Sequence, residues 1–273
     1  MGYALGCGNC LDGARLPFED EITMAFQPIF DLSTGGVFAQ EALLRGRDGR
    51  GAGEVMAEVD EGAIYRFDQT CRTTAIRLAA TLGLSDALSI NFLPNAVYEP
   101  RACMQLTLMV ADALDFPVER IIFEFSEVER VADKAHLQNI VRAYRDFGFR
   151  TAIDDFGSGY SGLSLIADVV PDIVKLDRDL VRGVHESATR RTILRALLNM
   201  CDDLGITVVA EGVEEAAELD TLAGMGVRLV QGFLTARPQF EALQNVSNLD
   251  LSGYGGGAGG CSAKRGNFVA RSA

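Results

Sequence analysis

The sequence predicts an α/β protein, a TIM-like (β/α)8 barrel with an antiparallel first strand. Apolar, strand-like runs alternate with amphipathic helical stretches along most of the chain. The first two runs are separated by only four turn residues, which cannot carry a parallel crossover and therefore predict an antiparallel pair. With 273 residues, 48% of them hydrophobic, the chain can bury one large core and lies within the size range of a single barrel domain.

The elements follow from this alternation in chain order. The antiparallel pair is expected at 24–32 and 37–45, with the turn at 33–36. Residues 54–82 are expected to be mostly helical, in two pieces broken near Gly62. The six further strands are expected at 88–93, 121–126, 151–156, 172–177, 207–212 and 229–234. Helical stretches such as 134–147 and 189–204 separate them.

Three segments are expected. Residues 1–20 lack periodicity and predict a flexible N-terminal arm, whereas 21–245 carry the barrel. Residues 246–273 are expected to form a glycine-rich disordered tail, because glycine and small residues dominate from 252 onward and cannot bury enough surface to order the backbone.

The charge balance limits the partners. The formal net charge is -13, which argues against a general nucleic-acid surface, and so against DNA, and against docking on anionic lipid. An anionic substrate would then need metal ions or a local basic residue. No apolar run reaches the roughly 18 residues of a membrane span, and no signal peptide is recognisable, so we expect a cytoplasmic protein without a membrane span.

The six cysteines allow two interpretations of the N-terminal arm. Cys7 and Cys10 have the spacing of half a zinc site or of a redox pair, but no second pair follows and both histidines are distant in sequence. The alternative is a mobile arm without a metal. Cys71, Cys103 and Cys201 fall in helical stretches and are expected to be reduced core residues.

Two adjacent carboxylates, Asp154 and Asp155, end an apolar strand and precede a glycine-spaced loop. Neighbouring strand residues point to opposite faces, so both can reach one site only where the backbone twists at a strand end. Burying two unpaired carboxylates costs several kcal/mol unless cations offset the charge. An ordinary turn is the alternative, because aspartate and glycine are both common in turns.

Other predicted strands also end on polar residues, which favours the site. In a barrel the C-terminal strand ends converge on one face, where chemistry collects. The residues expected there are Glu41, Asn91, Glu124, Glu127, Asp154, Asp155, Lys175, Asp177, Glu211, Glu214 and Gln231. Oxygen ligands without histidine or cysteine favour Mg²⁺ or Mn²⁺, and this set suffices for the two ions that assist displacement at phosphorus. Lys175 could hold the attacking hydroxide or neutralise a phosphate oxygen, or it could simply pair with the carboxylates.

Several motifs resemble the EAL family of cyclic di-GMP phosphodiesterases. They are Glu41-Ala42-Leu43 with Arg45, Phe26-Gln27-Pro28-Ile29, Asn91, Glu124-Phe125-Ser126-Glu127, the run 154–161, Val174-Lys175-Leu176-Asp177, Ala210-Glu211-Gly212-Val213-Glu214 and Gln231-Gly232-Phe233. The match covers about residues 22–243 in family order and at family-like spacing. The resemblance implies metal-dependent hydrolysis of one phosphodiester of cyclic di-GMP to linear pGpG.

The resemblance also implies roles for individual residues. Ligands of the first cation would be Glu41, Asn91, Glu124 and Asp154. Ligands of the second would be Asp154, Asp155 and Glu211, so that Asp154 bridges the two. Lys175 would contact the nucleophilic water, completing a catalytic set of Lys175, Glu211, Glu41, Asp154 and Asp155. Substrate contacts would be Gln27, Leu43, Arg45, Asp68 and Gln231.

Glu127 resembles the glutamate that anchors the loop after the fifth strand, 156–161. In the family this loop touches the dimer interface and relays signals from regulatory domains, so a homodimer and a sensor or regulatory protein partner are implied.

The sequence departs from the family on the guanine side. Residues 54–60 replace the usual segment after the second strand, Thr70 stands in place of a tryptophan, and Leu93 in place of a small polar residue. These changes affect substrate affinity more than the metal ligands. Two alternatives to an active phosphodiesterase are a catalytically silent cyclic di-GMP receptor or protein-interaction module of the same fold, and a barrel hydrolase of another phosphodiester. An enzyme that is nearly silent without its partner also remains open.

Overall fold

The computed structural model describes residues 18–127, 134–159 and 162–255. The strands are β1 (Ile22–Asp31), β2 (Gly36–Gly46), β3 (Ala87–Asn91), β4 (Ile121–Ser126), β5 (Arg150–Phe156), β6 (Ile173–Leu176), β7 (Thr207–Ala210), β8 (Leu229–Val230) and β9 (Gln239–Phe240). The α-helices are α1 (Ala52–Ala57), α2 (Ile64–Thr81), α3 (Pro100–Cys103), α4 (Gln105–Ala113), α5 (Lys134–Asp146), α6 (Gly162–Asp168), α7 (Arg178–Val181), α8 (Ala188–Asp203) and α9 (Ala216–Gly224). Short 3-10 helices are η1 (Glu61–Ala63), η2 (Pro94–Ala96), η3 (Val118–Arg120) and η4 (Ser252–Tyr254).

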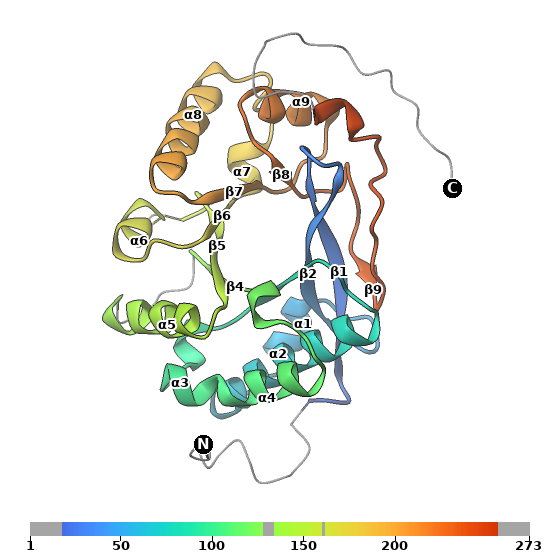
Figure 1. Ribbon diagram of the computed structural model, residues 1–273, viewed down its shortest axis with the longest axis vertical. Coiled ribbons are helices and arrows are strands. Elements are labelled where there is room, and N and C mark those ends of the chain that lie inside the picture. Colours follow the sequence, from blue (N-terminus) through green and yellow to red (C-terminus); the bar gives the residue numbers. More distant parts are fainter. Residues whose placement is uncertain (1–17, 128–133, 160–161, 256–273) are drawn as a thin grey trace.

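The strands close into a barrel surrounded by helices (Figure 1). Neighbours pair in parallel from β2 through β8, and the ring closes because β1 pairs antiparallel with both β8 and β2. This confirms the (β/α)8-type barrel with a reversed first strand. The predicted break in the first long helical region is also confirmed, since η1 separates α1 from α2.

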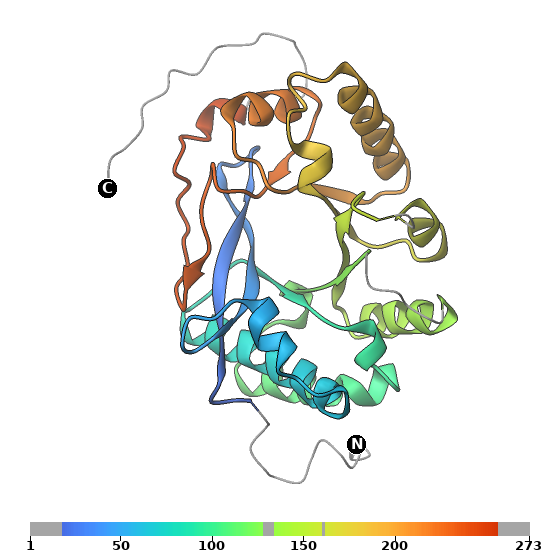
Figure 2. The same cartoon turned by 180° about the vertical axis from the view of Figure 1, so that it is seen from behind.

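Two differences concern the strands. The eighth strand is only two residues long, against the six expected at 229–234. The sequence did not predict β9, an exposed two-residue strand that pairs with β1 on the outside of the closed ring (Figure 2). A pair of residues carries no detectable period, so this strand depends on the neighbouring edge of β1 rather than on its own pattern.

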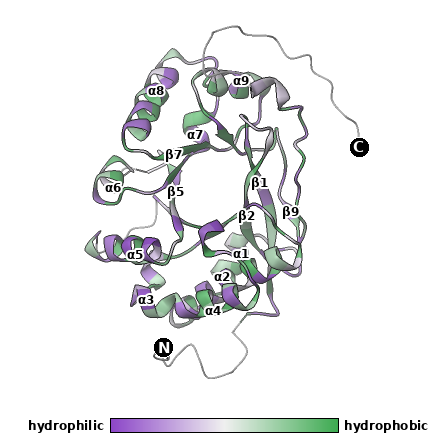
Figure 3. Cartoon of the chain, in the orientation of Figure 1, coloured by the Kyte–Doolittle hydropathy of each residue, from purple (hydrophilic) through white to green (hydrophobic). Residues whose placement is uncertain are grey.

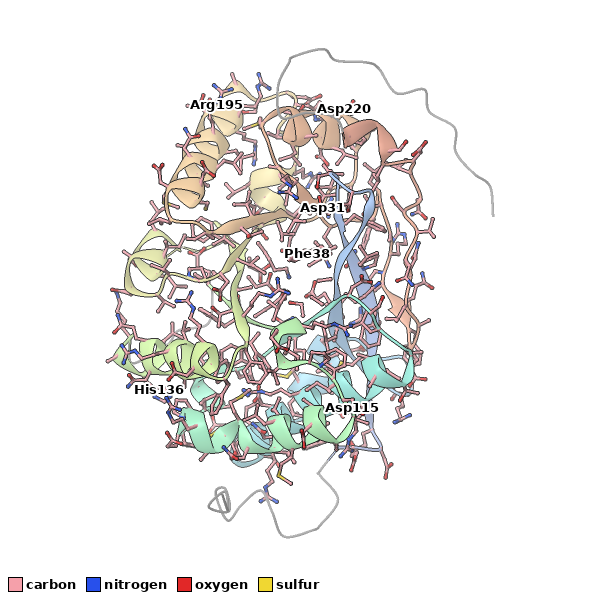
Figure 4. The ribbon with its side chains drawn as sticks, viewed as in Figure 1. Asp31, Phe38, Asp115, His136, Arg195 and Asp220 are labelled. Carbon is pink, nitrogen blue, oxygen red and sulfur yellow. The ribbon has the colours of Figure 1, made fainter. Side chains whose placement is uncertain are left out.

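The core has two parts because each strand alternates its side chains between two faces. The outward faces pack against the helices in the larger cluster, and helices such as α5 and α8 carry hydrophilic as well as hydrophobic residues (Figure 3). The inward faces contribute one apolar residue per barrel strand to a smaller cluster, namely Ile29, Ala39, Ala87, Ile122, Ala152, Ile173, Val209 and Leu229. Phe38, labelled in Figure 4, packs against this layer, and the guanidinium of Arg150 lies 5.3 Å from its ring centroid.

The ends of the chain differ from the expected segments where they are described. Within the predicted arm, the ring of Phe18 packs edge-on against Phe67 at 5.4 Å between centroids. The predicted disordered tail begins too early, because 246–255 are described and Leu251 is buried in the main core. Residues 1–17, with Cys7 and Cys10, and 256–273 lie outside the described residues. Cys103 and Cys201 are free and buried, and Cys71 is free and partly buried, as predicted for these three.

In the described part of the chain, helices are too short or too polar to cross a membrane.

Candidate active site

A polar layer lies directly above the apolar layer inside the barrel. Side chains on the same face of a strand are two positions apart, so each inward apolar residue of a parallel strand is followed two positions later by an inward residue nearer the C-terminal strand end. In the parallel strands these residues are Glu41, Ser89, Glu124, Asp154, Lys175, Glu211 and Gln231, and in the reversed β1 the equivalent is Gln27. The fold therefore brings seven of the predicted residues, together with Ser89, from eight separate strands or strand ends to one end of the barrel.

Lys175 lies at the centre of this layer and is 1% exposed. Its Nζ is 2.7 Å from Glu211 Oε1, 2.8 Å from Glu124 Oε2 and 2.9 Å from Asp154 Oδ1. Glu41 Oε2 lies at 3.3 Å. Burial alone would lower the pKa of Lys175, but the four surrounding carboxylates raise it well above its usual value, so the side chain carries a full positive charge.

One ammonium group cannot neutralise four buried carboxylates. Burial raises the pKa of Glu124 to about 8 and the pKa of Glu211 well above its usual value, and the pairing with Lys175 only partly opposes this. Burial also raises the pKa of Asp155, and the neighbouring Asp154 adds to the effect. Ionising all of these carboxylates at once is therefore costly unless a bound cation offsets their charge.

Two groups of carboxylates have the geometry of cation sites. Glu41, Glu124 and Asp154 form one, and Asp154, Asp155 and Glu211 form the other, with one ligand atom from each residue within 4.8 Å of the others in its group. Asp154 belongs to both groups. All-oxygen donors fit hard divalent cations, so the residues present suit Mg²⁺ or Mn²⁺.

A turn of the backbone allows both adjacent aspartates to reach this site. Asp155 has a φ of +53°, and the pairing register of β5 with β6 is interrupted between Ile153 and Phe156. This conformation is uncommon outside glycine, and aspartate is one of the residues that tolerate it. The predicted twist at this strand end is therefore present.

Neutral side chains hold the carboxylates in place. Gln231 Nε2 donates to Glu41 Oε2 at 2.7 Å and to Gln27 Oε1 at 3.3 Å, and Asn91 Nδ2 donates to Glu41 Oε1 at 3.2 Å. Asn91 thus leaves its amide oxygen as the atom that could bind a cation. Ser89 donates its hydroxyl to Glu124 Oε1. The sequence interpretation missed Ser89, although a polar residue two positions before Asn91 in an apolar strand indicates the same inward face.

Glu127 lies behind the two aspartates and holds the following loop. Its backbone nitrogen donates to Asp154 O at 3.1 Å, and its Oε2 accepts from Gly157 N at 2.7 Å. A Cβ atom at Gly159 would lie 2.8 Å from Glu127 Oε1, so a side chain at this position would require the carboxylate to shift. The anchoring role expected for Glu127 stays a prediction, and residues 160–161 lie outside the described part of the loop.

A cleft of about 240 Å³ opens beside the carboxylates. Its lining residues are Gln27, Glu41, Asp155, Asp177, Arg178, Glu211, Gly212, Glu214, Gln231, Gly232 and Phe233. Of the predicted substrate contacts, Gln27 and Gln231 are among them. Arg45 is partly exposed, and its Nη1 donates to Leu44 O at 2.7 Å. Leu43 is also partly exposed and, with Arg45, lies outside this lining.

Asp68 differs from the prediction because the structure does not bring it into the cleft. It is 3% exposed and forms an ion pair with Arg72 at 2.6 Å, and its Oδ1 accepts from Leu93 N at 3.0 Å. The guanidinium of Arg72 also donates to the hydroxyl of Tyr144 at 2.9 Å. Asp68 was predicted to contact substrate from its resemblance to a family position alone. The sequence interpretation did not consider Arg72, four residues further along the helix, as its partner.

The chain is similar to known proteins of one family. A family model described as the EAL domain matches residues 15–238. The chain is 29% identical over 243 residues to the blue light- and temperature-regulated antirepressor BluF of Escherichia coli K12, covering 89% of this chain and 60% of that protein. It is 27% identical over 238 residues to the cyclic di-GMP phosphodiesterase PA2567 of Pseudomonas aeruginosa, covering 81% and 39%. The chain thus spans between about two fifths and three fifths of the length of these relatives.

Solved structures of the same shape contain the nucleotide. A standalone versatile EAL protein from Vibrio cholerae O395, with c-di-GMP bound, matches with a TM-score of 0.81 and 50% identity over 83% of this chain and 96% of that chain. Klebsiella pneumoniae BlrP1 in a manganese and cyclic di-GMP complex matches with a TM-score of 0.79 and 35% identity over 85% and 59%.

Proposed function

The chain belongs to the EAL domain family, and from that premise we propose that it hydrolyses one phosphodiester bond of cyclic di-GMP to give linear 5′-pGpG, using two divalent cations, Mg²⁺ or Mn²⁺. The observation that carries the proposal is the presence, beside an open cleft, of two clusters of three acidic residues that have Asp154 in common. A relative named as a cyclic di-GMP phosphodiesterase and a solved neighbour that contains manganese with cyclic di-GMP support it.

We assign the protein ligands from the two groups. Glu41, Asn91, Glu124 and Asp154 would hold one cation, and Asp154, Asp155 and Glu211 the other. Bound divalent cations would lower the pKa of a water molecule and offset the charge that develops on the phosphate. The side chains of Asn91 and Gln231 donate to the two oxygens of Glu41 and so fix its orientation before any ligand arrives.

Lys175 is the catalytic cation of the chain itself. Its charge is fixed by the surrounding carboxylates, and these contacts place its ammonium group beside both proposed cation sites. There it would orient the attacking water and stabilise negative charge on the phosphate oxygens. Gln27 and Gln231 line the cleft, and with Leu43 and Arg45 they would contact the nucleotide.

The direct test is turnover of cyclic di-GMP with Mg²⁺ or Mn²⁺, followed by chromatography of pGpG. We expect turnover by the wild-type protein, and a loss of at least about 100-fold in kcat for both Glu41→Ala and Lys175→Ala, because each removes a group that acts on the transition state. EDTA should abolish the reaction and added Mn²⁺ restore it. Binding of cyclic di-GMP without turnover in either metal would refute the enzyme proposal.

A second candidate is a cyclic di-GMP receptor or protein-interaction module that does not hydrolyse its ligand. The observation that favours it is the relative named as an antirepressor, which is similar over 89% of this chain. The same assay distinguishes the two: a receptor binds cyclic di-GMP in calorimetry and leaves it intact, and a pure interaction module neither binds nor hydrolyses it.

A further inference from the structure

Phe233 forms an exposed aromatic wall of the cleft. It follows Gly232, where an added Cβ would lie 2.1 Å from Val213 O, so the two loops pack backbone against backbone. Leu234 N donates to Val213 O at 3.1 Å, which fixes the chain on the other side of Phe233. The backbone that carries the ring is therefore held firmly, while its side chain remains 44% exposed.

Arg237 covers one face of this ring. Its guanidinium carbon lies 4.2 Å from the ring centroid, the distance of a close cation–π contact. Phe233 is among the residues that line the cleft, and Arg237 is not. Phe233 thus borders the cleft beside Gln231 and Glu211, and the face of its ring opposite Arg237 is the one that this contact leaves free.

We propose that this face of Phe233 is a stacking platform for a guanine base, supported from behind by Arg237. The inference rests on the proposed function, since it assumes that the cleft receives a cyclic dinucleotide. A purine gains affinity by stacking on an aromatic ring whose position is already fixed, because little side-chain entropy is lost on binding. Phe233 would thus determine affinity for a nucleobase, a task distinct from the acidic residues that act on the phosphate.

The test compares three replacements of Phe233. Steady-state hydrolysis of cyclic di-GMP with Mn²⁺ gives KM and kcat, and calorimetry of the EDTA-treated protein gives Kd for the same nucleotide. We expect Phe233→Ala and Phe233→Leu to raise KM and Kd about tenfold, because the stacking of one base on an aromatic ring typically contributes about this factor to affinity. The value of kcat should stay within about twofold of wild type. Phe233→Trp should stay within about twofold of wild type, because it keeps an aromatic face. Arg237→Gln should raise both constants by about threefold.

Phe240→Ala is the matched control, because Phe240 is similarly exposed at 47% but lies on β9, outside the cleft lining. It should change neither constant. An unchanged KM and Kd in Phe233→Ala would overturn the platform, and so would wild-type constants in Phe233→Leu, which would show that apolar contact alone suffices. A shift in the Mn²⁺ concentration for half-maximal activity would also overturn it, by placing the effect at the carboxylates. If the wild-type protein binds without turnover, the calorimetric series still decides on the platform while the proposed hydrolysis fails.

Discussion

At the residue scale, Glu124 links the charge of the site to the stability of the fold. In the absence of metal, burial raises the pKa of Glu124 to about 8, whereas an unfolded glutamate titrates near its ordinary value of about 4.3. Between these values the folded state holds a proton that the unfolded state has lost, so stability falls as pH rises from about 5 to 8. We expect the EDTA-treated protein to melt at a lower temperature at pH 8 than at pH 6 in scanning calorimetry.

Added Mn²⁺ reverses this effect, because a cation binds the ionised carboxylates. The increase in Tm caused by Mn²⁺ should therefore be larger at pH 8 than at pH 6. Glu124→Gln is the control, since it keeps the shape but does not titrate, and its metal-free Tm should depend less on pH. An equally steep dependence in this variant would assign the effect to the other buried carboxyls, Glu211 and Asp155, or to the overall acidic charge instead.

At the element scale, a buried ion pair joins helix α2 to the segment after β3. Asp68 accepts from Leu93 N and pairs with Arg72, whose guanidinium lies over the rings of Phe92 and Phe123. Removing one partner leaves an uncompensated charge in the core, which costs about 3–5 kcal/mol. We expect Arg72→Leu to reduce the free energy of unfolding in urea by about this amount.

The double variant Asp68→Asn/Arg72→Leu provides the comparison. It removes both charges while keeping an amide oxygen that can accept from Leu93 N, so it should be considerably more stable than Arg72→Leu alone. If the ion pair is structural, KM for cyclic di-GMP in this double variant should stay within about threefold of wild type. A tenfold or larger increase in KM would instead indicate that Asp68 contacts the substrate.

At the scale of the whole molecule, the features that could be predicted from the sequence are those that follow from the periodicity of the strands and the length of their connections. Alternation in apolar strands placed Glu124, Asp154 and Lys175 on the inner face, and the short first connection required β1 to be reversed. Features that depend on a distant partner were not predictable. Two-residue β9 exists because β1 offers an edge. Asp68 and Arg72 face each other because they are four residues apart on α2, but the contacts of Arg72 with Tyr144, Phe92 and Phe123 that bury the pair come from distant segments.

The segment after the barrel shows the same dependence on distant partners. Composition suggested disorder from 246 onward, but Asn248 N donates to Thr235 O at 2.7 Å and Tyr254 Oη donates to Asp220 Oδ1 at 2.6 Å. Leu251 fills the core between these contacts at 3% exposure. The segment therefore packs against helix α9 and the loop after β8, and it is part of the folded domain.

Shortening the chain tests this conclusion directly. Loss of the buried side chain in Leu251→Ala should cost about 2–5 kcal/mol, which lowers Tm by roughly 4–20 °C for a domain of this size. Truncation after Asn245 removes Leu251 together with both hydrogen bonds, so it should lower Tm at least as far.

Val246→Ala is the matched control, because Val246 is 75% exposed and its truncation leaves no cavity. Truncation after Gly255 should change Tm by no more than about 1 °C, since the glycine-rich composition beyond it offers little apolar surface to bury. An unchanged Tm after truncation at Asn245 would return the domain boundary to the position that composition alone suggests.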